Sequence, residues 1–195
     1  MQQWINEREA KLQQVCEQKV SKAKKGLVGL NSLAIGERKA NLRQTNSIVQ
    51  DIVAFEPMIL SVTTKAEDLC QATPANEISI KYETLSKQAH EIYAKQKATV
   101  ESHQAFIDSG NEFVQWIRGA KEKLGKCSEP TGDKEFLASK IAQLKILESE
   151  LSEGQKKLQK ALEQGNLACQ IADSEEKEII EEEVALLQDE YDNYV

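Results

Sequence analysis

The side chains best suited to metal binding or catalysis are few and widely spaced in this chain. The two histidines, His90 and His103, are thirteen residues apart. On one helix they would lie roughly 20 Å apart along the axis, so they cannot share a metal ion. We expect both at the surface or at the boundary of a core. The sequence therefore predicts no metal site and no cofactor.

The four cysteines form no CxxC pair, which is typical of free, buried thiols in a reducing compartment. Metal ligation or nucleophilic catalysis by these thiols is the alternative. The four residues are Cys16, Cys70, Cys127 and Cys169.

Other patterns that bind phosphate or cations are incomplete. Gly26 and Gly29 lack the Lys-Ser/Thr pair that follows in a phosphate-binding loop. The acidic run at 181–183 is three successive residues, which point apart on a helix and form a solvated face. Catalysis needs polar groups that converge in a pocket, and no such set is visible. We therefore predict that the protein is not an enzyme.

A basic run is the best candidate for a partner-docking surface, and it consists of Lys19, Lys22, Lys24 and Lys25. The simpler interpretation is a solvated helix end, where cations meet the negative end of the helix dipole. The functional interpretation is a docking patch for an acidic partner or actin. The last helix is acidic, so end-to-end association is an option that salt would weaken.

The composition indicates long helices. The chain has 195 residues, few glycines, prolines and aromatic residues, and a net charge of -7. The negative charge argues against a nucleic-acid binder. No signal peptide and no apolar run near twenty residues is present, so we expect a cytoplasmic protein without direct membrane insertion.

A long helix, predicted over residues 74–125, organises the chain. Thr73 and Pro74 provide a capping hydroxyl and a proline at the first helical position. The run from Gly125 to Pro130 is a stop signal. Such a helix would be roughly 75 Å long, whereas a globular helix averages about a dozen residues. We therefore expect it to be the last helix of one bundle and the first helix of the next.

Four further helices are predicted, over 2–25, 32–72 and 134–172 and from 173 to the end of the chain. The turns between them fall at 26–32 and 128–133. Pro57 lies inside the second helix and predicts a kink or a local break. The helix over 134–172 carries a heptad seam, which Gly154 and Gly165 weaken because glycine is a poor helix former. Its seam positions include Leu137, Ile141, Leu144, Leu151, Leu158, Leu162 and Cys169.

Two sets of landmarks recur in the chain. Trp4, Ile5 and Leu12 return 112 residues later as Trp116, Ile117 and Leu124, and Ile78, Tyr82, Leu85 and Ala89 match Ile180, Val184, Leu187 and Tyr191 at an offset of 102. The repeat predicts two units, 1–94 and 95–195. The predicted core of the second unit includes Trp116, Leu124, Ile180, Leu187 and Tyr191. In the first unit, either Trp4 is the core position or that position lies nearer Cys16.

These landmarks resemble the spectrin repeat, a left-handed three-helix bundle with a tryptophan in its first helix. Trp116 matches that tryptophan, and Tyr191 matches a third-helix position that often holds tryptophan. The resemblance implies an all-α fold of two tandem spectrin-like three-helix bundles, joined by one continuous helix in an elongated rod.

The polar seam positions and scattered cysteines look like those of the giant linkers, namely nesprins, plakins and dystrophin-like proteins, with nesprins preferred. This resemblance implies a structural spacer and docking segment that ties the nuclear envelope to actin. Its partner would be a cytoskeletal protein or an actin regulator, such as a formin or a motor adaptor, with actin reached through the parent protein. The segment would be a monomer in the cytoplasm, on the cytoskeleton or at the outer nuclear envelope.

The alternative is a membrane-surface or dimerising coiled-coil scaffold module. A two-stranded coiled coil uses the same seam spacing. A membrane-surface module would carry clustered lysines and arginines along one face, whereas this chain has an excess of acid.

Overall fold

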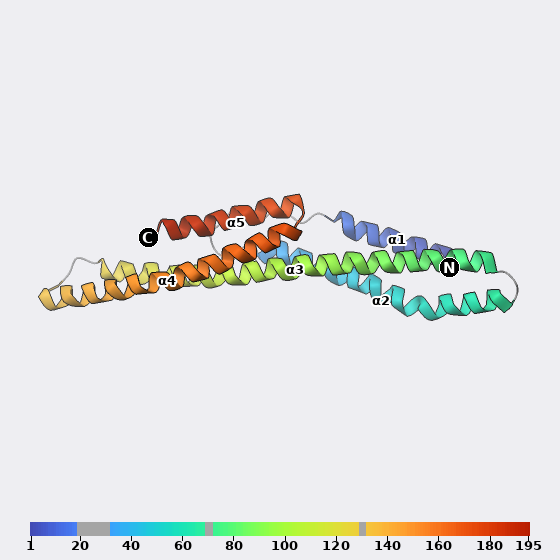
Figure 1. The fold of residues 1–195 in the computed structure, drawn as a ribbon, viewed down its shortest axis with the longest axis horizontal. Coiled ribbons are helices and arrows are strands. Elements are labelled where there is room, and N and C mark those ends of the chain that lie inside the picture. The colour runs from blue at the N-terminus through green and yellow to red at the C-terminus, as the bar shows by residue number, and fades with distance from the viewer. Residues whose placement is uncertain (19–31, 69–71, 129–131) are drawn as a thin grey trace. The chain divides into compact units, whose positions relative to one another are not determined.

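The computed structural model describes residues 1–18, 32–68, 72–128 and 132–195 (Figure 1). Within these ranges all regular structure is helical, so the predicted all-α class is confirmed. The helices are α1 (Gln2–Glu17), α2 (Ser32–Asp68), α3 (Ala72–Cys127), α4 (Lys134–Ile171) and α5 (Ser174–Asp192).

The chain divides into two units, and the division falls inside α3 between Val100 and Glu101. Among the described residues, unit 1 contains α1, α2 from Leu33 and the first part of α3. Unit 2 contains the rest of α3 together with α4 and α5. The predicted long helix over 74–125 is confirmed as one unbroken helix of 56 residues. Its ends follow the proline near its start and the glycine near its end, as the sequence signals require.

Unit 1 has its own apolar core, to which α1, α2 and α3 all contribute. Ile5, Ile52 and Leu85 are fully buried in it. Trp4 stacks on Phe55 of α2, with ring centroids 3.8 Å apart and planes 13° apart. Cys16 is exposed, so Trp4 and not Cys16 occupies the core-facing position of α1.

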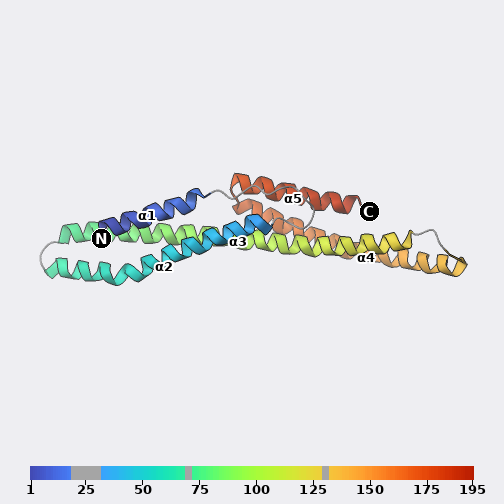
Figure 2. The same ribbon diagram turned by 180° about the vertical axis from the view of Figure 1, so that it is seen from behind.

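Pro57 bends α2 without breaking it. The helix continues through the proline over the whole of Ser32–Asp68, so of the two predicted outcomes, a kink or a local break, the break does not occur. Figure 2 shows the axis of α2 changing direction in its second half, which contains Pro57. Proline removes the hydrogen bond to the Val53 carbonyl, and both residues are exposed, so water can replace that bond. Nearby, the buried Tyr82 hydroxyl donates to the Ile52 carbonyl at 2.5 Å.

Unit 2 packs large aromatic side chains of α3 against small residues of α4. Phe106 and Phe113 are fully buried, and Trp116 is half-buried. A Cβ atom on Gly154 would stand 2.1 Å from Cη2 of Trp116, and one on Gly165 would stand 3.1 Å from Cε2 of Phe106. The two glycines therefore let the aromatic rings approach the α4 backbone. The sequence predicted only that glycine is a poor helix former here, and the structure adds that both glycines are packing positions.

The face of α4 that meets α3 is rotated from the predicted seam. Its buried residues are Leu147, Gly154, Leu158, Ala161, Gly165 and Ala168. The predicted seam positions Leu162 and Cys169 are only partly buried, and Leu137, Ile141 and Leu144 are exposed. Of these predicted seam positions, Leu158 alone is among the buried residues of α4.

Contacts along unit 2 define antiparallel neighbours. From one end of the α3–α4 pair to the other, Lys160 meets Glu112 at 3.2 Å, Lys123 meets Glu150 at 3.0 Å, and the Cys127 thiol lies 3.3 Å from the Gln143 amide oxygen. α5 returns along α4. Asp173 is its N-cap, and the carboxylate of Asp173 accepts a hydrogen bond from the Glu176 backbone N–H at 2.8 Å.

Candidate binding surface

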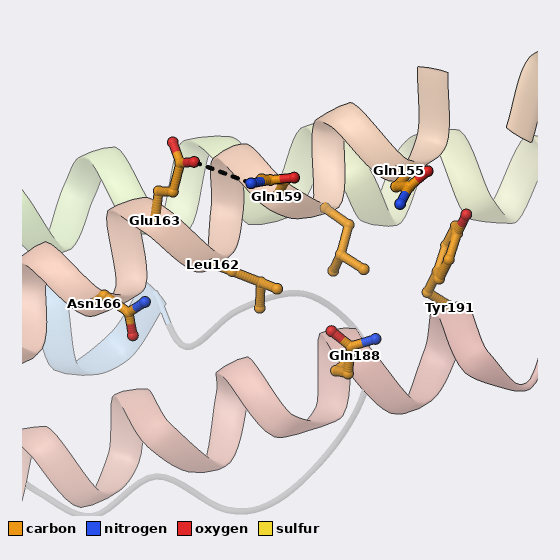
Figure 3. A pocket seen from close by; sticks show the side chains of 8 residues that line it. Gln155, Gln159, Leu162, Glu163, Asn166, Gln188 and Tyr191 are labelled. Carbon is orange, nitrogen blue, oxygen red and sulfur yellow. Dashed lines mark hydrogen bonds between the residues drawn. The ribbon is translucent and has the colours of Figure 1, made fainter. Parts of the chain in front are cut away.

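Two adjoining hollows lie between α4 and α5 in unit 2, with volumes of about 300 and 390 Å³. Both are lined by Leu162, Asn166 and Gln188, and together we call them the α4–α5 groove. Figure 3 shows Leu162 and Asn166 on α4 facing Gln188 and Tyr191 on α5. The remaining lining residues are Gln155, Leu158, Gln159, Glu163, Cys169, Glu181, Val184 and Ala185.

The groove combines apolar side chains with amides and suits a peptide or helix better than a small charged ligand. Leu158, Leu162 and Val184 supply apolar surface. The amides of Gln155, Asn166 and Gln188 each offer both donors and acceptors. Gln159 donates to Glu163 at 3.4 Å, as the dashed line in Figure 3 shows. Apolar and polar side chains therefore both line the groove, as they do in protein–protein interfaces.

The groove holds one nucleophilic group, and its environment makes that group unreactive. Burial raises the pKa of the Cys169 thiol, Glu181 and Glu176 raise it further, and Lys177 partly opposes them. A thiol with a raised pKa is protonated near neutral pH and is a poor nucleophile. Among the described residues, no three His, Cys, Asp or Glu side chains gather closely enough to hold a metal ion.

A buried pair of ionisable side chains joins α3 to the start of α5. Nδ1 of His103 lies 3.0 Å from Oε1 of Glu176, and each side chain is 1% exposed. The expected surface or boundary position is therefore wrong for His103, although it holds for His90, which is exposed and bonds the Ser86 carbonyl at 2.7 Å. One feature of the sequence indicated the burial of His103: it precedes Phe106 by one helical turn and so lies on the same side of the helix.

Of the predicted core residues, Ile180 and Leu187 belong to the core of unit 2, and Trp116 and Tyr191 pack against it. Ile180 and Leu187 are 0% and 3% exposed, whereas Trp116, Leu124 and Tyr191 are half-buried. Tyr191 lies 6.3 Å from Phe113 between ring centroids. Trp116 lies against Gly154 on one side and meets Tyr194 edge-on at 5.9 Å.

The lysines proposed for docking, Lys19, Lys22, Lys24 and Lys25, lie outside the described residues, and so does Cys70. Of the other thiols, Cys127 is buried and Cys169 is partly buried. Cys16 is exposed, so the expectation of buried thiols is wrong there. It sits in α1 one residue past the buried Val15, on the side that turns to solvent.

The chain is similar to one segment of a large muscle protein. It is 64% identical over 194 residues to "Muscle-specific protein 300 kDa" of Drosophila melanogaster. The match covers 100% of this chain but 2% of the relative, so the chain spans a small fraction of that protein's length. No family model matches the chain, and the resemblance to spectrin repeats stays a prediction. No solved structure matches it either. In the part of the chain that the structure describes, no helix is long and apolar enough to cross a membrane.

Proposed function

We propose that this chain is a structural segment of a large cytoskeletal protein and spaces other parts of that protein through its helical units. The observation that carries the proposal is the 64% identity, which extends over the whole chain and falls on 2% of a muscle-specific protein. A segment of so long a protein, built entirely from helices in its described parts, fits a spacer better than an enzyme.

The physical basis of the spacer is the pair of separate cores. Ile52, Leu85 and Ala89 belong to the core of unit 1, and Phe106, Leu158 and Ile180 belong to that of unit 2. Because α3 contributes to both cores, its continuous backbone hydrogen bonds carry load from one unit to the other. Each unit can lose its own packing while the other keeps its own, which lengthens the chain stepwise under tension.

The finer proposal adds a partner and a place in the cell. The parent protein would tie the nuclear envelope to actin, and this segment would bind an actin regulator, such as a formin or a motor adaptor, through a helical face. The muscle-specific relative and the resemblance to nesprins support it. The α4–α5 groove and the lysine run from Lys19 to Lys25 are the two surfaces offered for docking.

Scattering from the purified chain tests the spacer proposal. We expect a monomer by light scattering and a rod about 100 Å long by small-angle scattering, the length of two bundles of roughly 50 Å each. A compact particle or a dimer would contradict it and favour the dimerising scaffold. Binding to lipid vesicles rich in anionic lipid would favour the membrane-surface module instead.

The partner proposal needs a separate measurement with purified actin and a purified formin or motor adaptor. We expect the chain to bind the regulator and not actin itself. A variant with Lys22, Lys24 and Lys25 changed to Glu tests the lysine run, and Gln188→Glu tests the groove. Each variant is the control for the other, because the two surfaces share no residue. Binding that neither variant reduces would contradict both docking surfaces.

A further inference from the structure

The α4–α5 groove lies on the side of the α4–α5 pair that faces away from α3. Gly154 and Gly165 are the α4 positions that pack against aromatic rings of α3. Gln155 and Asn166 each follow one of these glycines by one residue, which turns the side chain by about 100° around the helix. Both line the groove. On α4, therefore, the groove begins where the surface that meets α3 ends.

α5 shows the same division between its two sides. Glu190 bonds Lys121 of α3, whereas Gln188 lines the groove. Two residues along a helix turn a side chain by about 200°, so Glu190 and Gln188 leave α5 on nearly opposite sides. Every described residue that lines the two hollows belongs to α4 or α5. The groove is therefore a surface of the α4–α5 pair that α3 does not line.

The middle of the groove offers apolar surface to a partner. Leu162 lines both hollows, and Val184 lines one of them. Both side chains are only partly buried against the core of unit 2, so part of each remains accessible to another molecule. Figure 3 shows Leu162 on α4 facing Gln188 on α5. Since hollows of about 300 and 390 Å³ adjoin along the helices, apolar side chains from successive turns of one partner helix can fill them.

The shape of the groove selects a helix as its occupant. The lining runs along α4 from Gln155 to Cys169, which is a rise of about 21 Å. A helix of about fourteen residues has that length. An extended peptide would need a sheet edge for its backbone hydrogen bonds, and both walls of the groove are helices, whose backbone groups bond within the helix. A helical partner satisfies its own backbone and presents only side chains to the groove.

Charge determines the chemistry of the partner. Residues 178–195, which include most of α5, contain no lysine, arginine or histidine. Glu181 of α5 and Glu163 of α4 line the groove, and the described lining residues include no lysine or arginine. Lys177 lies 3.7 Å from Glu181, but exposed pairs of this kind are weak, so a cation of the partner can replace Lys177. The α5 side of the groove therefore complements a basic edge and repels an acidic one.

We propose that the α4–α5 groove binds one amphipathic helix of a partner protein, and that this helix has a basic edge. Its apolar stripe packs on Leu162 and Val184, and its lysines and arginines lie along α5. The partner helix stands on the side of the α4–α5 pair opposite to α3, so unit 2 gains a fourth helix. The inference rests on the docking role proposed for the groove and adds the chemistry of the segment that docks.

Three synthetic peptides of about fourteen residues, held helical by side-chain staples, test the proposal. The first has leucines at steps of three and four residues and has lysines and arginines along one edge. The second has glutamate in place of every lysine and arginine. The third has the composition of the first in an order that destroys the apolar stripe. Each peptide is titrated into the 195-residue chain, and NMR signals of the chain are followed.

We expect the first peptide to shift the amide signals of Leu162, Val184 and Ala185 and to bind about tenfold more tightly than either control. Signals of unit 1 should not move. Equal affinity of the first and second peptides would overturn the basic edge, and equal affinity of the first and third would overturn the apolar stripe. Groove signals that stay in place at about millimolar peptide would overturn the site itself.

A matched pair of charge reversals locates the basic edge. Glu181 and Glu182 are adjacent and exposed, but Glu181 lines the groove and Glu182 lies about 100° farther around α5, outside the lining. Glu181→Lys should weaken binding of the first peptide about tenfold, and Glu182→Lys should weaken it less than about threefold. Both variants should keep the urea midpoint of the parent chain, because both side chains are exposed. Equal weakening by the two would indicate attraction to net charge alone and would overturn the groove as the site.

Gln188→Glu separates the apolar stripe from the basic edge. Gln188 lines both hollows and faces Leu162, so it lies beneath the apolar stripe of the bound helix. A carboxylate there would be buried against apolar side chains, which is unfavourable. Gln188→Glu should therefore weaken binding of the first peptide, although it adds a negative charge to the groove. Tighter binding to this variant would overturn the proposed placement of the helix.

Three further outcomes separate this inference from the proposed function. Association of the chain with itself that grows with concentration, and that Glu181→Lys prevents, would assign the groove to a second copy and overturn the partner helix. If the actin regulator does not bind while the basic peptide occupies the groove, the proposed regulator is wrong and the groove inference stands. If no peptide enters the groove while scattering shows a monomeric rod, the partner helix is wrong and the spacer proposal stands.

Discussion

Gly154→Ala should destabilise unit 2, although alanine normally favours a helix over glycine by about 1 kcal/mol. The added Cβ would stand 2.1 Å from Cη2 and 2.2 Å from Cζ3 of Trp116. Carbon atoms pack best at about 3.5–4.0 Å, so the indole must move by more than an ångström. It cannot do so freely, because Phe113 and Tyr194 lie against it at centroid distances of 6.3 and 5.9 Å.

The expected magnitude follows from two opposing terms. Overpacking a core costs typically about 1–3 kcal/mol, and the confined ring places this site in the upper part of that range. Subtracting the helix preference of about 1 kcal/mol leaves a net loss of about 1–2 kcal/mol. Gly119→Ala is the matched control on α3, because a Cβ there has no neighbour within 4 Å. It should stabilise unit 2 by about 0.5–1 kcal/mol.

Urea unfolding followed by tryptophan fluorescence measures both variants in a Trp4→Phe background, so that Trp116 alone reports on unit 2. Gly154→Ala should lower the midpoint and Gly119→Ala should raise it. A second substitution, Trp116→Leu, should remove most of the Gly154→Ala penalty because the clash disappears. Urea unfolding of that pair is followed by circular dichroism, because no tryptophan remains in it. A Gly154→Ala protein as stable as the parent, with unchanged fluorescence, would refute the reasoning.

Three further predictions address other contacts. His103→Leu should destabilise unit 2 by about 3–5 kcal/mol, since it removes a partner of the buried Glu176 carboxylate. Adding Glu176→Leu should recover much of the loss. Urea unfolding measures both variants, and an unchanged midpoint for His103→Leu would contradict a stabilising contact between the two side chains. Burial raises the pKa of the Tyr82 hydroxyl above its usual 10.0, and the nearby Glu56 raises it further. The contribution of Tyr82 to the stability of unit 1 is therefore present at lower pH and is lost as the pH rises through the raised pKa. Thermal unfolding of unit 1 should show this loss of stability at alkaline pH, and Tyr82→Phe should reduce it. Glu101→Pro, at the division between the two units, should interrupt α3 and separate the unfolding of the units. One unaltered transition by calorimetry would contradict the coupling of the units through α3.

The ends of α3 and the start of α5 were predictable because they depend on local chemistry, whereas α1 ends at Glu17 and not at residue 25 as predicted. Pro74 lies in the first turn of α3, and Gly125 lies in its last turn. Asp173 caps α5 through a hydrogen bond to a backbone N–H three residues on. Caps and breakers act within a few residues, so one sequence contains the whole signal.

The packed face of α4 was not predictable in the same way. Gly154 and Gly165 have low helix propensity, and only their partners on α3 explain them. Trp116 is separated from Gly154 by a loop and half a helix, so spacing along the chain does not reveal the contact. The heptad pattern instead predicted Leu162, which is larger than glycine, as a seam position. In the structure Leu162 lies beside the face that meets α3.

The contact between Glu176 and His103 was also not predictable from the sequence. Glu176 has the position of a favourable acid at a helix start, yet its side chain lies beside His103 inside unit 2. His103, the partner of Glu176, belongs to a helix that is far away in the sequence. Periodicity predicts which side of a helix is apolar, but it does not predict which polar side chain is buried on that side. The docking role of Lys19, Lys22, Lys24 and Lys25 stays a prediction.

The match of rings to glycines also determines how unit 2 responds to shear. If α4 slid along α3 by one turn, the indole of Trp116 would leave Gly154 and meet the larger side chain of Leu151 or Leu158. Neither position has room for the ring, so small displacements find no intermediate resting place. In a bundle whose helices meet through leucines at every turn, the contacts are similar in each register, so one helix can slide past another in small steps. Unit 2 should instead behave as a brittle element, stiff up to a threshold force and then yielding in a single step.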